Sequence, residues 1–212
     1  MDPDVDTLDA WTQMIFDRKK HACLPDLPEG YGLLCLIDLQ NNVKTALAVN
    51  GAAIAAAVIL AVIGNFIIPM ATALEGEMFS VLLRLGVMVI CVVVYIVLHE
   101  LTHGAAMRYY GSKTVKYGLT GKYAYTGSSE YYDKASYIVI TLAPVVLWGI
   151  VLAVVCACVP SQWFWTFFFV QITNLSGAAG DAYVTYKLIR LPDTIRISDS
   201  GVAMKVYGLS DK

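Results

Sequence analysis

Two histidines stand four positions apart with a glutamate between them, in His99-Glu100-Leu101-Thr102-His103. On an α-helix, residues i and i+4 lie one above the other on the same face, so both imidazoles could bind one zinc ion. Glu100 would then lie beside a water held by that ion, within reach of its proton. This spacing predicts metal-assisted hydrolysis, with His99 and His103 as ligands and Glu100 as the general base.

The residues around this motif are those of a membrane protein. The chain of 212 residues is 58% hydrophobic and 15% charged, which is too apolar for an ordinary soluble domain of this size. No residue from Leu85 to Leu98, directly before the motif, is charged. We therefore expect the helix that carries the motif to lie in a bilayer.

The apolar residues divide into four stretches. The run from Ala135 to Gly180 carries no formal charge, and as one helix it would be roughly 70 Å long, about twice what a bilayer needs. It must therefore contain two helices, with a turn at Val159-Pro160-Ser161-Gln162. The predicted fold class is an all-α integral membrane protein with four transmembrane helices, near 45–70, 78–107, 136–158 and 163–188.

The polar loop between the second and third helices has a pattern of its own. Residues 113–119 and 122–125 flank Thr120-Gly121 and alternate in polarity, which predicts a short cytoplasmic β-hairpin. An exposed strand of this hairpin could hold a substrate segment in extended form, or the hairpin could be a simple connector.

Positive charge orients the helices. Of the 15 Lys and Arg residues, four precede the first helix, five lie between the second and third, and five end or follow the fourth. The positive-inside rule then places both termini and the loop at 111–134 in the cytoplasm. The chain divides into a cytoplasmic N-terminal segment, 1–43, a four-helix transmembrane domain, 44–190, and a cytoplasmic C-terminal tail, 191–212. The chain has a net charge of −2 and no distributed basic surface, so we expect no nucleic-acid partner.

A zinc ion that keeps one position open for water needs a third protein ligand. The two motif histidines lie nine and five residues before Arg108, roughly 13 and 8 Å along a helix. Asp181 lies six residues before Lys187, roughly 9 Å, so its depth matches. Inserting a carboxylate into a membrane costs about 2.5 to 3.5 kcal/mol, so an aspartate at the depth of the two histidines is better explained as a ligand than as an accident. Asp181 is therefore the favoured third ligand, with Glu130, at a downstream separation that soluble zinc hydrolases use, as the alternative.

Two features accompany Asp181. Small residues precede it, from Ser176 to Gly180, and others follow the second histidine, at Gly104-Ala105-Ala106, so the second and fourth helices could pack closely enough to share a metal. Asn174 lies seven residues before Asp181. Its amide could donate to a developing oxyanion or form an interhelical hydrogen bond, and the sequence leaves both interpretations open.

Several short motifs together resemble one family. From about Leu27 to the C-terminus the chain resembles the small bacterial membrane proteins described as putative zincin peptidases. It is also similar to site-2 proteases, which carry H-E-x-x-H on one membrane helix and a metal-binding aspartate on a later one. The resemblance implies zinc bound by His99, His103 and Asp181, with Glu100 as catalytic base, in a bacterial plasma membrane. The motifs that carry it are Leu27-Pro28-Glu29-Gly30-Tyr31, Val97 to Gly104, Tyr123-Ala124-Tyr125, Leu142-Ala143-Pro144 and Gly180-Asp181.

The predicted function is that of a membrane-embedded zinc metalloprotease that hydrolyses peptide bonds near the cytoplasmic membrane face. Zn²⁺ would be its cofactor, and its partners would be the lipid bilayer and a membrane-associated protein or peptide substrate. The alternative is a non-enzymatic zinc-binding membrane protein, with a structural zinc or a partner-binding role. A closed site with four protein ligands would favour this alternative, and an open fourth position would favour the protease.

Overall fold

The computed structural model describes residues 22–38, 42–119, 124–201 and 203–210. The chain separates into two compact units. One comprises Met1–Asp38, His103–Ile140 and Leu188–Lys212 and contains the β-strands, and the other comprises Leu39–Thr102 and Thr141–Lys187 and contains most of the helical residues.

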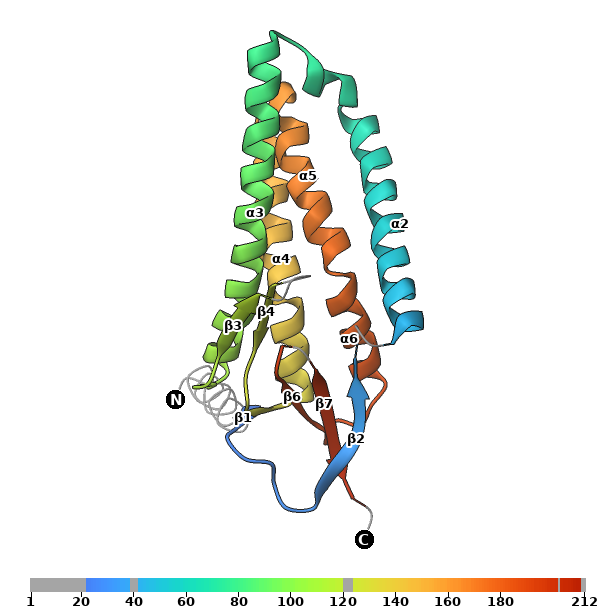
Figure 1. The fold of residues 1–212 in the computed structure, drawn as a ribbon, viewed down its shortest axis with the longest axis vertical. Helices are drawn as coiled ribbons and strands as arrows, with labels where there is room; N and C mark the ends of the chain where they lie inside the picture. The colour runs from blue at the N-terminus through green and yellow to red at the C-terminus, as the bar shows by residue number, and fades with distance from the viewer. Residues whose placement is uncertain (1–21, 39–41, 120–123, 202, 211–212) are drawn as a thin grey trace, which may run out of the picture. The chain divides into compact units, whose positions relative to one another are not determined.

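Within the described part of the chain, three helices are long and apolar enough to cross a membrane. They confirm three of the four predicted helices, including the one that carries the histidine motif, and they support a multi-pass membrane protein. A short 3₁₀ helix, η1, follows the first of them (Figure 1). The elements are α2 (Val43–Ile67), η1 (Met70–Leu74), α3 (Met78–Tyr109) and α4 (Lys134–Cys158).

The prediction of one continuous fourth helix over 163–188 is wrong. Two helices occupy this stretch, α5 (Ser161–Gly177) and α6 (Ala179–Ile189), and Ala178 lies between them with ψ near zero, at 6°. The Ser176 hydroxyl donates to the Ile172 carbonyl at 2.7 Å, and glycine follows at position 177. A hydroxyl bonded back to the helix and a glycine both weaken helical structure, so α5 ends here. Asp181 consequently lies in the first turn of a new helix.

The all-α prediction is also wrong, because the described residues form a mixed α/β fold. Five short strands make an antiparallel sheet in the order β1-β5-β6-β7-β2. Tyr132, Ile197 and Val206, one from each of its three central strands, are fully buried. The strands are β1 (Cys23–Leu24), β2 (Tyr31–Ile37), β5 (Tyr131–Asp133), β6 (Arg196–Asp199) and β7 (Met204–Leu209).

The predicted hairpin between the second and third helices is confirmed, with shorter strands than expected. Strand β3 (Lys116–Leu119) pairs antiparallel with β4 (Ala124–Gly127), and Leu119 lies opposite Ala124. The residues predicted to form its turn, Thr120-Gly121, lie outside the described part of the chain. Tyr117 of β3 packs on the end of α3, because its hydroxyl occupies the space that a Cβ at Gly104 would need.

Helix α5 packs against α2 through an aromatic cluster. Phe164, Trp165 and Phe168 are buried there, with the rings of Phe164 and Phe168 stacked at 4.9 Å. Gly64 of α2 permits this contact, since a Cβ at that position would lie 2.3 Å from the Phe168 ring. Trp165 Nε1 also donates to the Ile68 carbonyl at the end of α2, at 3.0 Å.

We predict that Gly64→Ala destabilises the protein by about 1–3 kcal/mol, because the added methyl overlaps a ring that its stacked neighbours hold in place. Thermal unfolding in detergent measures the effect. Gly51→Ala is the matched control on the same helix, because nothing lies within 4 Å of a Cβ there, and it should be neutral or slightly stabilising. Equal unfolding temperatures for the two variants would contradict the packing argument.

Candidate metal site

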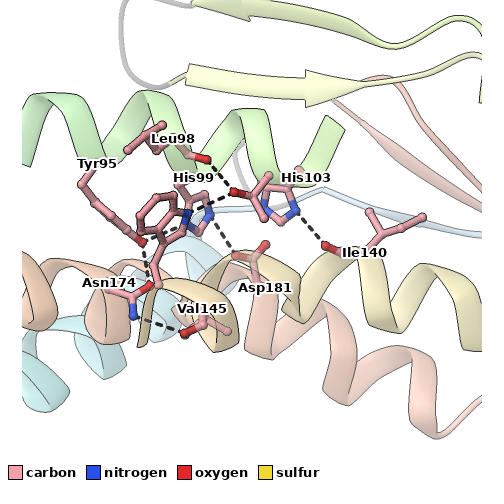
Figure 2. Close-up of polar contacts among 10 residues, drawn as sticks. Tyr95, Leu98, His99, His103, Ile140, Val145, Asn174 and Asp181 are labelled. Carbon is pink, nitrogen blue, oxygen red and sulfur yellow. Dashed lines mark hydrogen bonds and ion pairs between the residues drawn. The ribbon is translucent and has the colours of Figure 1, made fainter. Parts of the chain in front are cut away.

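Three side chains converge at the end of α3 and the start of α6. His99 and His103 lie one turn apart on the continuous helix α3, and Asp181 lies in the first turn of α6. Each offers one ligand atom, and these atoms all lie within 4.8 Å of one another. Figure 2 shows the Asp181 carboxylate facing the His99 ring, with His103 beside them. This group could hold a metal ion.

The distances within the group fit zinc. His99 Nε2 and Asp181 Oδ2 are 3.5 Å apart. Two atoms that each bind a tetrahedral zinc ion at about 2.1 Å are separated by roughly 3.4 Å, so the observed spacing suits two ligands of one ion. Two imidazoles and one carboxylate are also donors that zinc accepts. The residues present therefore fit the metal that the sequence pattern predicts.

The ring of His103 is held by a helix backbone. Its Nδ1 lies 3.0 Å from the Ile140 carbonyl oxygen of α4, and because a carbonyl can only accept, Nδ1 carries the proton. In a regular helix that carbonyl would accept from the N–H of residue 144. Pro144, inside α4, has no N–H, so the carbonyl of Ile140 is available to the imidazole. His103 is left with an unprotonated Nε2 for a metal.

The ring of His99 is held by side chains. Its Nδ1 lies 2.8 Å from the Tyr95 hydroxyl, which donates to Asn174 Oδ1, also at 2.8 Å (Figure 2). Asn174 Nδ2 in turn donates to the Val145 carbonyl of α4 at 3.2 Å. A metal-binding histidine usually has its second nitrogen occupied in this way, which fixes the ring and leaves the other nitrogen for the ion.

Asn174 is therefore an interhelical residue, which was one of its two predicted roles. Its side chain is fully buried and connects α5 to α3 and α4. Its amide group is directed at the Val145 carbonyl and, at 3.4 Å, at Gln171 Oε1. This arrangement does not support the predicted donation to an oxyanion.

Glu100 follows His99 on α3 and is partly buried. It does not belong to the group of three ligand atoms. Its predicted role as the general base stays a prediction.

Glu130, the alternative third ligand, has a different place. It is 6% exposed and also lies outside the group of three ligand atoms. Its carboxylate accepts from the Ser112 hydroxyl, from the Lys113 N–H at 2.8 Å and from the Thr114 hydroxyl at 2.9 Å. Burial by itself raises the pKa of Glu130, but these hydrogen bonds outweigh it and lower the pKa below the ordinary value of 4.5. Glu130 thus fixes the loop that follows α3.

Sequence reasoning missed the supports of the two histidines. Tyr95 stands four residues before His99, so the helical period that pairs the histidines could have found it. The Ile140 carbonyl carries no signal of its own, but a proline four residues later marks a carbonyl that is free to accept.

A group of two histidines and one aspartate, with both histidines on a helix long and apolar enough to span a membrane, defines a candidate membrane metalloprotein. The model of a family described as "Putative zincin peptidase" matches residues 92–196, which include His99, His103 and Asp181. Over this region the chain is similar to the proteins of that family. No curated protein and no solved structure matched the chain.

We predict that Glu130→Ala lowers the free energy of unfolding by about 1.5–3 kcal/mol, because it removes hydrogen bonds to a buried charge. Since the folded-state pKa of Glu130 is depressed, its contribution is present above the unfolded value of 4.5 and is lost as the pH falls through the lower folded value. Unfolding measured across this pH range tests both statements. Glu29→Ala, at an exposed position, is the control, and equal effects of the two variants would exclude a structural role for Glu130.

Proposed function

We propose that this protein is a membrane-embedded zinc metalloprotease that hydrolyses peptide bonds near the cytoplasmic membrane face. One observation carries the proposal: His99, His103 and Asp181 present three ligand atoms within 4.8 Å of one another. Three protein ligands leave a fourth position for water, as in catalytic zinc sites, whereas structural sites use four protein ligands. The family match supports the same reaction class.

Each residue has a separate role in this reaction. Bound at the site, zinc supplies a positive charge that polarises the scissile carbonyl and lowers the pKa of a water. Glu100 takes a proton from the attacking water and passes it to the leaving amine. Asp181, in the first turn of α6, contributes negative charge where the helix dipole favours it. The histidines keep their Nε2 atoms unprotonated through the hydrogen bonds of their Nδ1 atoms.

The substrate class follows from where the motif lies along its helix. His103 is six residues before the end of α3 at Tyr109, roughly 9 Å along the helix. This distance supports a site inside the membrane boundary and close to one face. A substrate must bring its scissile bond to that depth, which a membrane-associated protein or peptide can do.

The proposed orientation places both termini and the loop after α3 in the cytoplasm, because 14 of the 15 Lys and Arg residues then lie on that side. Cysteine labelling in a background without native cysteines measures it. A cysteine at the exposed Lys116 should react only from inside, and one at the exposed Ser161 should react from outside. The reverse pattern would overturn the orientation.

The decisive prediction concerns Glu100 and Asp181 together. Glu100→Gln should retain one zinc per chain and lose about 10²- to 10⁴-fold in peptide-bond hydrolysis, because the amide keeps the shape but cannot accept a proton. Asp181→Ala should lose zinc, because it removes a ligand. Metal analysis of the purified variants measures their zinc content. Comparative membrane proteomics of cells that express wild type or Glu100→Gln measures peptide-bond hydrolysis.

Fragments cut near the cytoplasmic membrane face that appear with wild type and not with Glu100→Gln would support the protease and identify its substrate. Identical fragment profiles, together with a wild-type phenotype in the Gln variant, would instead support a non-enzymatic zinc protein. Retention of zinc by Asp181→Ala would show that the third ligand is wrong.

A further inference from the structure

We propose that Tyr95 and Asn174 are positioning residues that hold His99 in the one tautomer able to bind the metal through Nε2. This inference rests on the proposed function, because it assigns a support to one ligand of that same site. Tyr95 contacts Nδ1 of His99 and Asn174 contacts Tyr95, so each acts on the metal site through the imidazole of His99.

The hydrogen bonds from His99 through Tyr95 and Asn174 form a series that ends at a backbone carbonyl, and this carbonyl sets the direction of each bond. The Val145 carbonyl can only accept, so the nitrogen of the Asn174 amide must face it, at 3.2 Å. The amide oxygen of Asn174 must then face Tyr95, at 2.8 Å. Gln171 Oε1, on the same side as the Val145 carbonyl, accepts from the same nitrogen at 3.4 Å and gives a second reason for this orientation.

The hydroxyl of Tyr95 transmits this orientation to His99. A phenol has one proton, and the Asn174 oxygen can only accept, so the Tyr95 proton points to Asn174. The hydroxyl oxygen must then accept from His99 Nδ1, which lies at 2.8 Å. His99 therefore carries its proton on Nδ1 and its acceptor electron pair on Nε2, the atom that lies 3.5 Å from Asp181 Oδ2.

Burial protects this series of hydrogen bonds from exchange with water. Asn174 is 0% exposed and Tyr95 is 6% exposed, so water cannot readily replace either partner. Leu152 and Val170 pack with Tyr95 in one buried cluster and fix its ring. The Tyr95 ring also meets the His99 ring edge to face, at 5.7 Å and 68°.

The two histidines differ in a way that makes the inference testable. His103 is held by the Ile140 carbonyl, a backbone atom that no side-chain substitution at position 140 removes. His99 is held by two side chains, so substitution can release it while His103 keeps its support. A loss of zinc affinity in such variants would thus report on His99.

The experiment measures the zinc dissociation constant of the full-length protein in detergent by competition with a chelator. Tyr95→Phe removes the acceptor for His99 Nδ1 and should weaken zinc binding about 10- to 100-fold. Asn174→Ala lets the Tyr95 hydroxyl turn its proton toward His99, which favours the wrong tautomer, and should also weaken binding. In the Tyr95→Phe background, Asn174→Ala should cause no further loss, because Asn174 acts only through the tyrosine hydroxyl.

A second measurement does not depend on zinc. Nitrogen-15 spectra of the histidine rings in metal-free protein should show His99 protonated on Nδ1 in wild type and shifted toward Nε2 in Asn174→Ala. Thr102→Val is the matched control, because it removes another interhelical hydrogen bond on α3, the 3.0 Å contact from Trp148 Nε1, without touching a ligand. Its zinc affinity should stay at the wild-type value.

Wild-type affinity in Tyr95→Phe would overturn this inference alone, and so would equal losses from Asn174→Ala with and without the tyrosine hydroxyl. An equal loss of affinity in Thr102→Val would overturn it as well, since any interhelical contact would then matter. Wild-type protein that binds no zinc would refute the metal site, and with it the inference.

Discussion

The site depends on the 3.5 Å approach of the Asp181 carboxylate to the His99 imidazole. Two ligands at this separation suit one small cation. The break at Ala178 sets the approach, because it starts a new helix and puts Asp181 in the first turn of α6. The end of α5 at Ala178 thus determines where the Asp181 carboxylate lies.

Helix α4 contributes no ligand to the group, yet its backbone orients both imidazoles. The Ile140 carbonyl accepts directly from His103, and the Val145 carbonyl fixes the amide that orients His99 through Tyr95. A membrane interior offers little water to satisfy such groups, so each carbonyl that leaves the helical pattern needs a partner. Pro144 removes the helical donor of the Ile140 carbonyl, and the cost of a proline within a helix is offset by an anchored ligand.

The sheet fixes segments of the chain that lie outside the apolar helices. Its strands come from the N-terminal region, from the loop after α3 and from the C-terminal region. Pairing across such separations costs chain entropy, which the buried residues Tyr132, Ile197 and Val206 help to repay. Glu130 orders the loop between α3 and β5 through hydrogen bonds to its charged carboxylate.

The sequence by itself determined the features that depend on local periodicity. The apolar runs predicted α2, α3 and α4, the four-residue spacing put His99 and His103 on one helix face, and depth along the helices favoured Asp181 over Glu130. Only the tertiary structure decided the five-stranded sheet and the hydrogen bonds from His99 to Asn174. These depend on contacts between residues far apart in the chain, with Tyr95 and Asn174 separated by 79 positions. Periodicity says which face a residue occupies, but not which partner that face will meet.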